Sequence, residues 1–230
     1  HKILTGRKDD FKSIRLFKGI SGFPKQTESE HDILNTGHSS TSISAALGLA
    51  KARDLKNEDY SVIAVIGDGS LGSGMALEAL NNAAYLDTNL IIILNDNKMS
   101  ISKNVGSLSD YLNRLRTGKV YFRIKQDLEY LLKKVPLIGG FLYKTAQKFR
   151  NWFKYLIVKG MIFEELGFKY FGPIDGHNIE AMERIIKNAK TYKKHPVIIH
   201  VITKKGNGYL AAEEKPDKFH LKQLGTVFWI

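Results

Sequence analysis

A carboxylate stands between two glycines where an apolar, β-branched run ends. Residues 62–66 read VIAVI and lead into GDGSLG at residues 67–72. This G-x-G-x-x-G spacing is typical of dinucleotide-binding loops, in which backbone N–H groups approach a diphosphate. Asp96, at the end of the next apolar run, would then hold a ribose. A nucleotide site of this kind is one hypothesis for the motif.

Asp68 is an unfavourable neighbour for a diphosphate, because like charges repel strongly in a confined site. A divalent cation between them reverses the effect, and Mg²⁺ commonly joins protein oxygens to phosphate oxygens. The next apolar run ends in LNDN at residues 94–97, so Asn97 offers an amide oxygen. A tight turn or a polar loop explains either residue alone. The pair, on adjacent parallel strands, predicts a magnesium site.

The elements that would position this pair follow from hydrophobic patterning. Residues 62–66, 90–94 and 197–202 are continuous apolar runs, as expected for parallel strands buried on both faces. Helices are expected over residues 71–86, over about 40–55, and from an Asn178 N-cap to about 192. The order predicts an α/β fold with a doubly wound, mostly parallel sheet, helices on both faces, and ligands at the carboxyl ends of the strands.

Composition narrows the classes of protein. The chain has 230 residues, 43% of them hydrophobic and 25% charged, and no cysteine. A packed core is therefore expected, and disulfides, thiolate metal sites and cysteine nucleophiles are excluded. No apolar run reaches the roughly 18 residues that a membrane-spanning helix needs. The chain begins at His1 without a visible leader, so we expect a piece of a longer protein.

Most of the positive charge lies in one stretch. The net charge is +12, and residues 114–159 contain twelve Lys or Arg against two acids, with nine aromatic residues. We interpret about residues 113–159 as a variable basic insertion of two amphipathic helical pieces, whose rings pack on the parent domain. We also expect it to be mobile or only locally helical, and to fold over the cofactor edge rather than complete the sheet. A basic module that binds nucleic acid or a membrane surface is the alternative.

Several motifs together carry a family resemblance. Gly67, Asp68 and Gly69, followed by 27 residues and Asn97, resemble the metal signature of thiamine diphosphate enzymes. The chain is similar, over about residues 1–112 and 160–220, to the N-terminal, diphosphate-binding domain of the 1-deoxy-D-xylulose-5-phosphate synthase family, of the transketolase-like superfamily. The stretches that carry this likeness are HKILTGR at 1–7, GHSSTSIS at 37–44, LNDNKMSIS at 94–102, GPIDGH at 172–177 and TKKGNGY at 203–209.

The resemblance implies roles for individual residues. Asp68, Asn97 and the backbone carbonyl of Met99 would hold Mg²⁺, and His220 would reach the reaction centre as a catalytic residue. Ser39 also suits an ordinary helix N-cap, and His177 is assigned a structural role. The residues implied to bind thiamine diphosphate are Gly37, His38, Ser39, Gly69, Ser70, Asn97, Lys205 and Tyr209.

The resemblance also implies an activity. It is the condensation of pyruvate with glyceraldehyde 3-phosphate, with loss of CO₂, by a cytoplasmic homodimeric transferase that supplies precursors of isoprenoids, thiamine and pyridoxal. No nucleic-acid or membrane partner is implied. We take residues 1–230 as the diphosphate-binding domain and expect the pyrimidine-binding and C-terminal domains to lie outside this chain, which would be inactive alone. Transketolase or another thiamine diphosphate enzyme is the alternative within this class.

Overall fold

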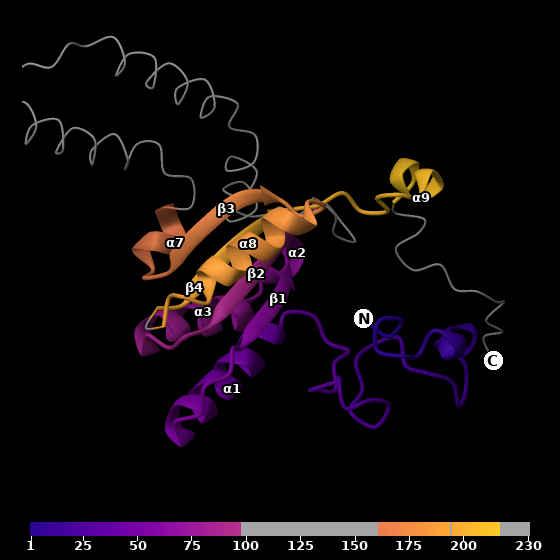
Figure 1. The fold of residues 1–230 in the computed structure, drawn as a ribbon, viewed down its shortest axis with the longest axis horizontal. Coiled ribbons are helices and arrows are strands. Elements are labelled where there is room, and N and C mark those ends of the chain that lie inside the picture. Colours follow the sequence, from indigo (N-terminus) through magenta and orange to yellow (C-terminus); the bar gives the residue numbers. More distant parts are fainter. Residues whose placement is uncertain (98–160, 194, 217–230) are drawn as a thin grey trace, which may run out of the picture. The chain divides into compact units, whose positions relative to one another are not determined.

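The computed structural model describes residues 1–97, 161–193 and 195–216 (Figure 1). The chain forms two compact units, His1–Ser39 and Ser40–Ile230. Each unit is described by itself. The predicted basic insertion lies outside the described residues. Its expected helices and mobility are therefore not tested.

The second unit is built on a parallel sheet. Its strands are β1 (Ile63–Gly67), β2 (Ile91–Asp96), β3 (Lys169–Asp175) and β4 (Val197–Ile202), in the order β1-β2-β4-β3. Gly67 pairs with Asn95 of β2, and Asp96 of β2 pairs with Ile202 of β4. The three strands expected from the apolar runs are confirmed, and the carboxyl ends of β1, β2 and β4 meet at one edge.

Strand β3 was not expected from the sequence. It carries Pro173, which cannot donate a hydrogen bond to a neighbouring strand, and its register with β4 shifts between Phe171 and Ile174. Among the described strands, β3 pairs with β4 alone, because it is the last strand in the order. An edge strand can carry a proline and a register shift. Both interrupt the apolar run by which the other strands were predicted.

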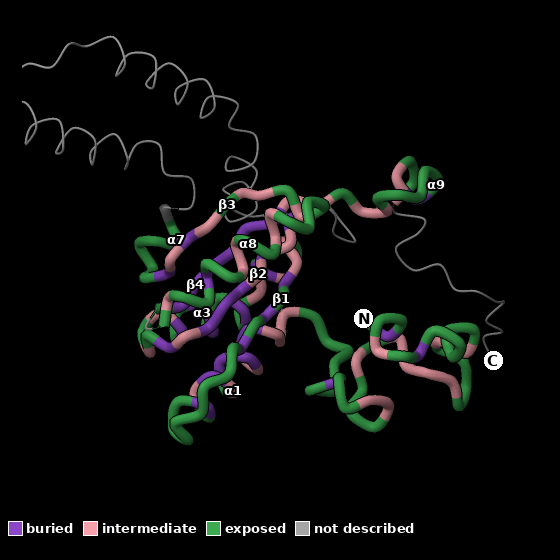
Figure 2. The backbone as a smooth tube through the Cα atoms, viewed as in Figure 1, coloured by how far each residue is buried: buried purple, intermediate pink, exposed green. Residues whose placement is uncertain are grey.

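Helices cover both faces of the sheet, as predicted (Figure 1). Helices α1 (Ser42–Lys56), α3 (Gly74–Leu86) and α7 (Met161–Glu165) contribute to one buried cluster with alternate residues of the strands. Helix α8 (Ile179–Ala189) packs through Met182, Ile185 and Ile186 on the other face. Figure 2 shows that the residues along β2 and β4 are mostly buried. None of the described helices combines the length and hydrophobicity that a transmembrane helix requires.

Two helix starts follow ordinary capping chemistry. The Asn178 side chain accepts a hydrogen bond from the Ala181 backbone N–H at 3.0 Å, which confirms the predicted cap of α8. The Ser73 side chain accepts from the Ala76 N–H at 3.3 Å at the start of α3. Helix α1, in contrast, has Thr41 as its N-cap residue, and the Thr41 side chain makes no capping hydrogen bond. The suggestion that Ser39 caps this helix was therefore wrong.

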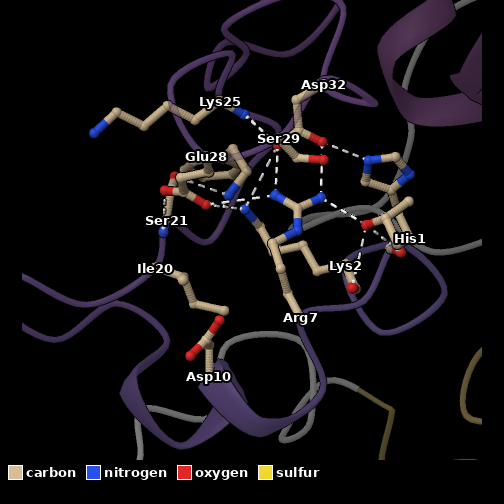
Figure 3. Close-up of polar contacts among 12 residues, drawn as sticks. His1, Lys2, Arg7, Asp10, Ile20, Ser21, Lys25, Glu28, Ser29 and Asp32 are labelled. Carbon is tan, nitrogen blue, oxygen red and sulfur yellow. Dashed lines mark hydrogen bonds and ion pairs between the residues drawn. The ribbon is translucent and has the colours of Figure 1, made fainter.

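The first unit has an ionic centre. Every residue of His1–Ser39 is described, and the buried ones are Lys2, Arg7 and Asp32. The Arg7 guanidinium donates to both Asp32 carboxylate oxygens, at 2.7 and 2.9 Å. The same carboxylate contacts His1 Nε2 at 2.6 Å and accepts from the Lys25 backbone N–H at 2.8 Å (Figure 3). A second carboxylate, the half-buried Glu28, pairs with Lys2 at 2.5 Å. This small unit therefore has an ionic centre where a larger domain would use an apolar core.

These contacts hold the pKa of Asp32 well below its usual range. The Arg7 hydrogen bond is the largest cause, followed by the Lys25 backbone N–H. An acid whose pKa is lower in the folded state stabilises that state above its unfolded pKa, which is about 4 for Asp. The stabilisation is lost as the pH falls from there towards the folded-state pKa.

We expect Asp32→Asn to unfold residues 1–39 while the sheet unit stays folded, because the buried Arg7 would lose its two short carboxylate contacts and keep only Glu28 at 3.6 Å. Acidification of the wild type below about pH 4 should have the same local effect. Hydrogen exchange resolved by segment measures it, with the exposed Asp9→Asn in the 3-10 helix Asp9–Ser13 as control. Equal protection of residues 1–39 in both variants would contradict the ionic-centre interpretation.

Candidate functional site

Asp68 and Asn97 follow directly on neighbouring strands. Because Gly67 and Asn95 are paired in the parallel β1–β2 ladder, the chain leaves both strands at the same edge. The Asp68 carboxyl is half-buried and is stabilised in its charged form by hydrogen bonds from the backbone amides of Asn97, Asp68 and Gly69. The predicted juxtaposition of Asp68 with Asn97 is therefore present in the fold.

The pKa of Asp68 is raised despite these hydrogen bonds. Burial is the largest cause, and the nearby Asp96 carboxylate adds to it. Two carboxylates beside each other at a partly buried strand edge are costly unless positive charge is brought in. A divalent cation supplies that charge, and the carboxylate and amide oxygens present are the hard ligands that Mg²⁺ prefers. The residues fit such an ion.

Asp96 itself is buried and tied into the sheet. It is 1% exposed, and its Oδ2 lies 3.2 Å from His200 Nε2 on β4. His200 is fully buried, and its Nδ1 lies 2.8 Å from the Tyr170 hydroxyl on β3. A series of polar contacts thus runs from Asp96 on β2 through His200 on β4 to Tyr170 on β3. An aspartate enclosed in this way cannot hold a ribose, so the dinucleotide interpretation of Asp96 was wrong.

The glycine motif also departs from a dinucleotide loop. The chain after β1 makes the single helical turn α2 (Asp68–Leu71), passes Gly72, and begins the long helix α3 only at Gly74. The long helix expected from residue 71 therefore starts three residues later. Gly69 is exposed and Ser70 half-buried. A Cβ added at Gly67 or Gly72 would meet no atom within 4 Å, which leaves room on this side of the turn for a ligand's approach.

The loop after β4 reaches the same edge. The Thr203 N–H donates to the Asp96 carbonyl at 3.0 Å, and its hydroxyl donates to Asn95 Oδ1 at 2.6 Å. These bonds fix the start of residues 203–209 against the end of β2. Lys205 is half-buried in this loop, and Tyr209, 60% exposed, precedes the short helix α9 (Leu210–Glu214). The sheet thus brings this predicted cofactor-binding loop to the edge that carries Asp68 and Asn97.

The structure does not test the positions of the other predicted site residues relative to Asp68 and Asn97. Met99 and His220 lie outside the described residues. Gly37, His38 and Ser39 are exposed and belong to the first unit. Their contacts with a metal or cofactor stay predictions. Across the described ranges, no group of three or more His, Cys, Asp or Glu could hold a metal. The predicted set contains only one carboxylate.

Sequence reasoning missed the residues that support the loop and the strand ends. Neither His200 nor Thr203 was given a role at the site from the sequence, because neither residue stands out by spacing. The structural role predicted for His177 agrees with its bonds to residues 203–209, at 2.8 Å to the Lys204 N–H and 3.2 Å to the Asn207 amide. Its place beside β3 could not be foreseen while that strand was unrecognised.

The sequence is similar to a known protein family over most of its length. The family described as 1-deoxy-D-xylulose-5-phosphate synthase matches residues 1–203. The chain is 60% identical over 220 residues to the 1-deoxy-D-xylulose-5-phosphate synthase of Carboxydothermus hydrogenoformans and 59% identical over 220 to that of Natranaerobius thermophilus. Each alignment covers 96% of this chain and 35% of the relative.

Solved structures agree on the fold. A transketolase from Leishmania mexicana superposes with a TM-score of 0.53 at 22% identity, covering 85% of this chain and 24% of the transketolase. A transketolase from Campylobacter jejuni gives 0.52 at 22% identity, with the same coverage. At this identity the likeness shows the fold alone.

Proposed function

The chain belongs to the 1-deoxy-D-xylulose-5-phosphate synthase family, and from this premise we propose that it forms the diphosphate- and Mg²⁺-binding part of such an enzyme. It spans 35% of the length of the curated relatives that it matches. The proposed activity of the whole enzyme is transfer of a two-carbon unit from pyruvate to glyceraldehyde 3-phosphate, with release of CO₂. Residues 1–230 are proposed as one thiamine diphosphate-binding domain.

The observation that carries the proposal is the meeting of Asp68 and Asn97 at one strand edge, beside the buried charge of Asp96. Asp68, Asn97 and the Met99 carbonyl would bind Mg²⁺, which bridges them to the diphosphate. Asp68 supplies the charge, and Asn97 adds a neutral oxygen. This division makes Asp68 the residue whose loss costs the most affinity.

The remaining cofactor residues would each bind a different part of the ligand. Gly69 and Ser70 lie in the turn that follows β1, where backbone N–H groups can donate to phosphate oxygens. Lys205 would add positive charge opposite the diphosphate, and the exposed Tyr209 ring would cover an edge of the cofactor. The bound cofactor supplies the nucleophilic carbon and the electron sink that decarboxylation of a 2-oxo acid requires.

Residues elsewhere would complete the enzyme. A carboxylate from a second domain would activate the cofactor's aminopyrimidine, and His220 would hydrogen-bond or exchange a proton with the reacting substrate. We propose that the whole protein is a cytoplasmic homodimer. We also propose that its cofactor lies in a cleft between two domains. These roles rest on the family, since His220 lies outside the described residues.

The test is a product assay on the enzyme that contains this chain together with its later domains. We expect 1-deoxy-xylulose 5-phosphate and one CO₂ per turnover from pyruvate and glyceraldehyde 3-phosphate, dependent on thiamine diphosphate and Mg²⁺. A ketose phosphate offered in place of pyruvate should not serve as donor. Turnover with the ketose and none with pyruvate would identify a transketolase instead.

A further inference from the structure

The loop at residues 203–209 contains two glycines that need support. Gly206 and Gly208 have φ angles of +79° and +89°, a region that few other residues adopt. A Cβ at Gly206 would lie 2.7 Å from the Ala212 carbonyl carbon, so this glycine also allows close approach to α9. Two flexible residues next to Lys205 and Tyr209 make a fixed loop entropically costly. Contacts from outside the loop must offset that cost.

His177 holds the first half of the loop. It follows β3, where the Asp175 carboxylate accepts the His177 backbone N–H at 2.9 Å. Its Nε2 accepts the Lys204 backbone N–H at 2.8 Å, and its Nδ1 lies 3.2 Å from the Asn207 side-chain amide. Gly176 permits this approach, because a Cβ there would lie 2.3 Å from Val201 Cγ1. One imidazole thus joins the end of β3 to the loop after β4.

Glu213 holds the second half from α9. Its Oε1 accepts the Gly208 backbone N–H at 2.8 Å, and its other oxygen pairs with the Lys204 ammonium. These partners lower the pKa of Glu213, with Lys204 as the largest cause. Lys204 is therefore held twice, by its backbone at His177 and by its side chain at Glu213. The segment between Lys204 and Gly208 is fixed at both ends.

The hydrogen bonds define the state of the imidazole. A backbone N–H can only donate, so the Nε2 that accepts from Lys204 carries no proton. The proton of a neutral ring is then on Nδ1, which lies 3.2 Å from the side-chain nitrogen of Asn207. A second proton on the ring would remove the acceptor that Lys204 uses.

We propose that His177 and Glu213 are positioning residues, which latch the loop so that Lys205 and Tyr209 meet the diphosphate cofactor in a fixed arrangement. The inference deepens the proposed function and rests on it for the identity of the ligand. Neither residue is proposed to touch the cofactor. The latch itself is a property of the loop and can be measured without any ligand.

Hydrogen exchange tests the latch without cofactor. His177→Ala should speed exchange of the Lys204 amide at least tenfold, and Glu213→Ala should do the same at Gly208. His177→Gln should restore protection at Lys204, because its side-chain oxygen can replace the Nε2 acceptor. The matched control is His195→Ala, which removes an exposed imidazole paired with Asp87 at 2.6 Å. Unchanged exchange at Lys204 in His177→Ala would overturn the latch whatever the ligand.

A phosphorus NMR titration with thiamine diphosphate and Mg²⁺ tests its consequence. We expect His177→Ala to weaken binding about tenfold, and His177→Gln and His195→Ala to leave it within about twofold. A tenfold loss corresponds to about 1.4 kcal/mol. Wild-type affinity in His177→Ala, or an equal loss in His177→Gln, would overturn the positioning role. No binding by the wild type, with Lys204 exchange still faster in the variant, would instead count against the proposed function.

Discussion

Replacing Asp68 with alanine should abolish Mg²⁺-dependent binding of thiamine diphosphate. The cation would lose its charged ligand, and the diphosphate would then face the buried Asp96 carboxylate without a bridging ion. We expect affinity to fall about a hundredfold or more, which corresponds to about 2.7 kcal/mol. Calorimetric titration at fixed Mg²⁺ measures the loss.

Two further variants sharpen this result. Asn97→Ala should lose only about tenfold, or about 1.4 kcal/mol, because water can replace a neutral ligand. Asp59→Ala is the matched control, since this carboxylate is 91% exposed just before β1 and pairs only loosely with Lys193 at 3.3 Å. Undiminished binding by Asp68→Ala would remove the metal bridge from the proposal.

The second large effect concerns catalysis. The 230-residue chain expressed alone should turn over no pyruvate, although it carries Asp68 and Asn97. The curated relatives are about three times as long, and the carboxylate that activates the aminopyrimidine is proposed to come from a later domain. Tyr209 is 60% exposed and Leu210 70% exposed, and we propose that the later domain covers this part of the chain in the whole enzyme. We therefore expect weak cofactor binding and a rate at background.

A complementation assay measures this. Adding the separately expressed later domains should restore release of CO₂ from pyruvate, and the same mixture made with Asp68→Ala should stay silent. Turnover by the 230-residue chain alone, purified free of host enzyme, would contradict the assignment. It would mean that a carboxylate within these residues performs the activation.

Much of the fold was predictable because three of its strands are apolar along their whole length. The expected burial on both faces holds for β2 and β4, whereas Ile63 and Val65 of β1 are exposed. β1, β2 and β4 are continuous apolar runs, and such runs reveal themselves in any sequence. β3 was not predictable by the same rule, because Pro173 and a register shift interrupt it at the end of the strand order. Asp68 and Asn97 were found because a carboxylate between glycines is chemically unusual.

The supporting residues could not be found in that way. Asp96 resembles a ribose ligand in the sequence, and only the contact with His200 shows that it is buried. The ionic centre around Asp32 leaves no trace either, since its partners Arg7 and Lys25 follow no period. Long-range polar contacts of this kind depend on where the chain returns, which local spacing does not encode.

The most direct test of the central claim is a titration of the wild-type chain with thiamine diphosphate, repeated with Mg²⁺ and with a chelator. Phosphorus NMR can detect weak binding of thiamine diphosphate, which we expect from this chain without the later domains. The proposed metal site at Asp68 and Asn97 predicts that, with Mg²⁺, the protein shifts or broadens the diphosphate resonances relative to Mg²⁺ and thiamine diphosphate alone. With the chelator, the resonances of the free ligand are expected. Binding indifferent to the chelator would contradict the account, because the diphosphate would then be held without a metal bridge.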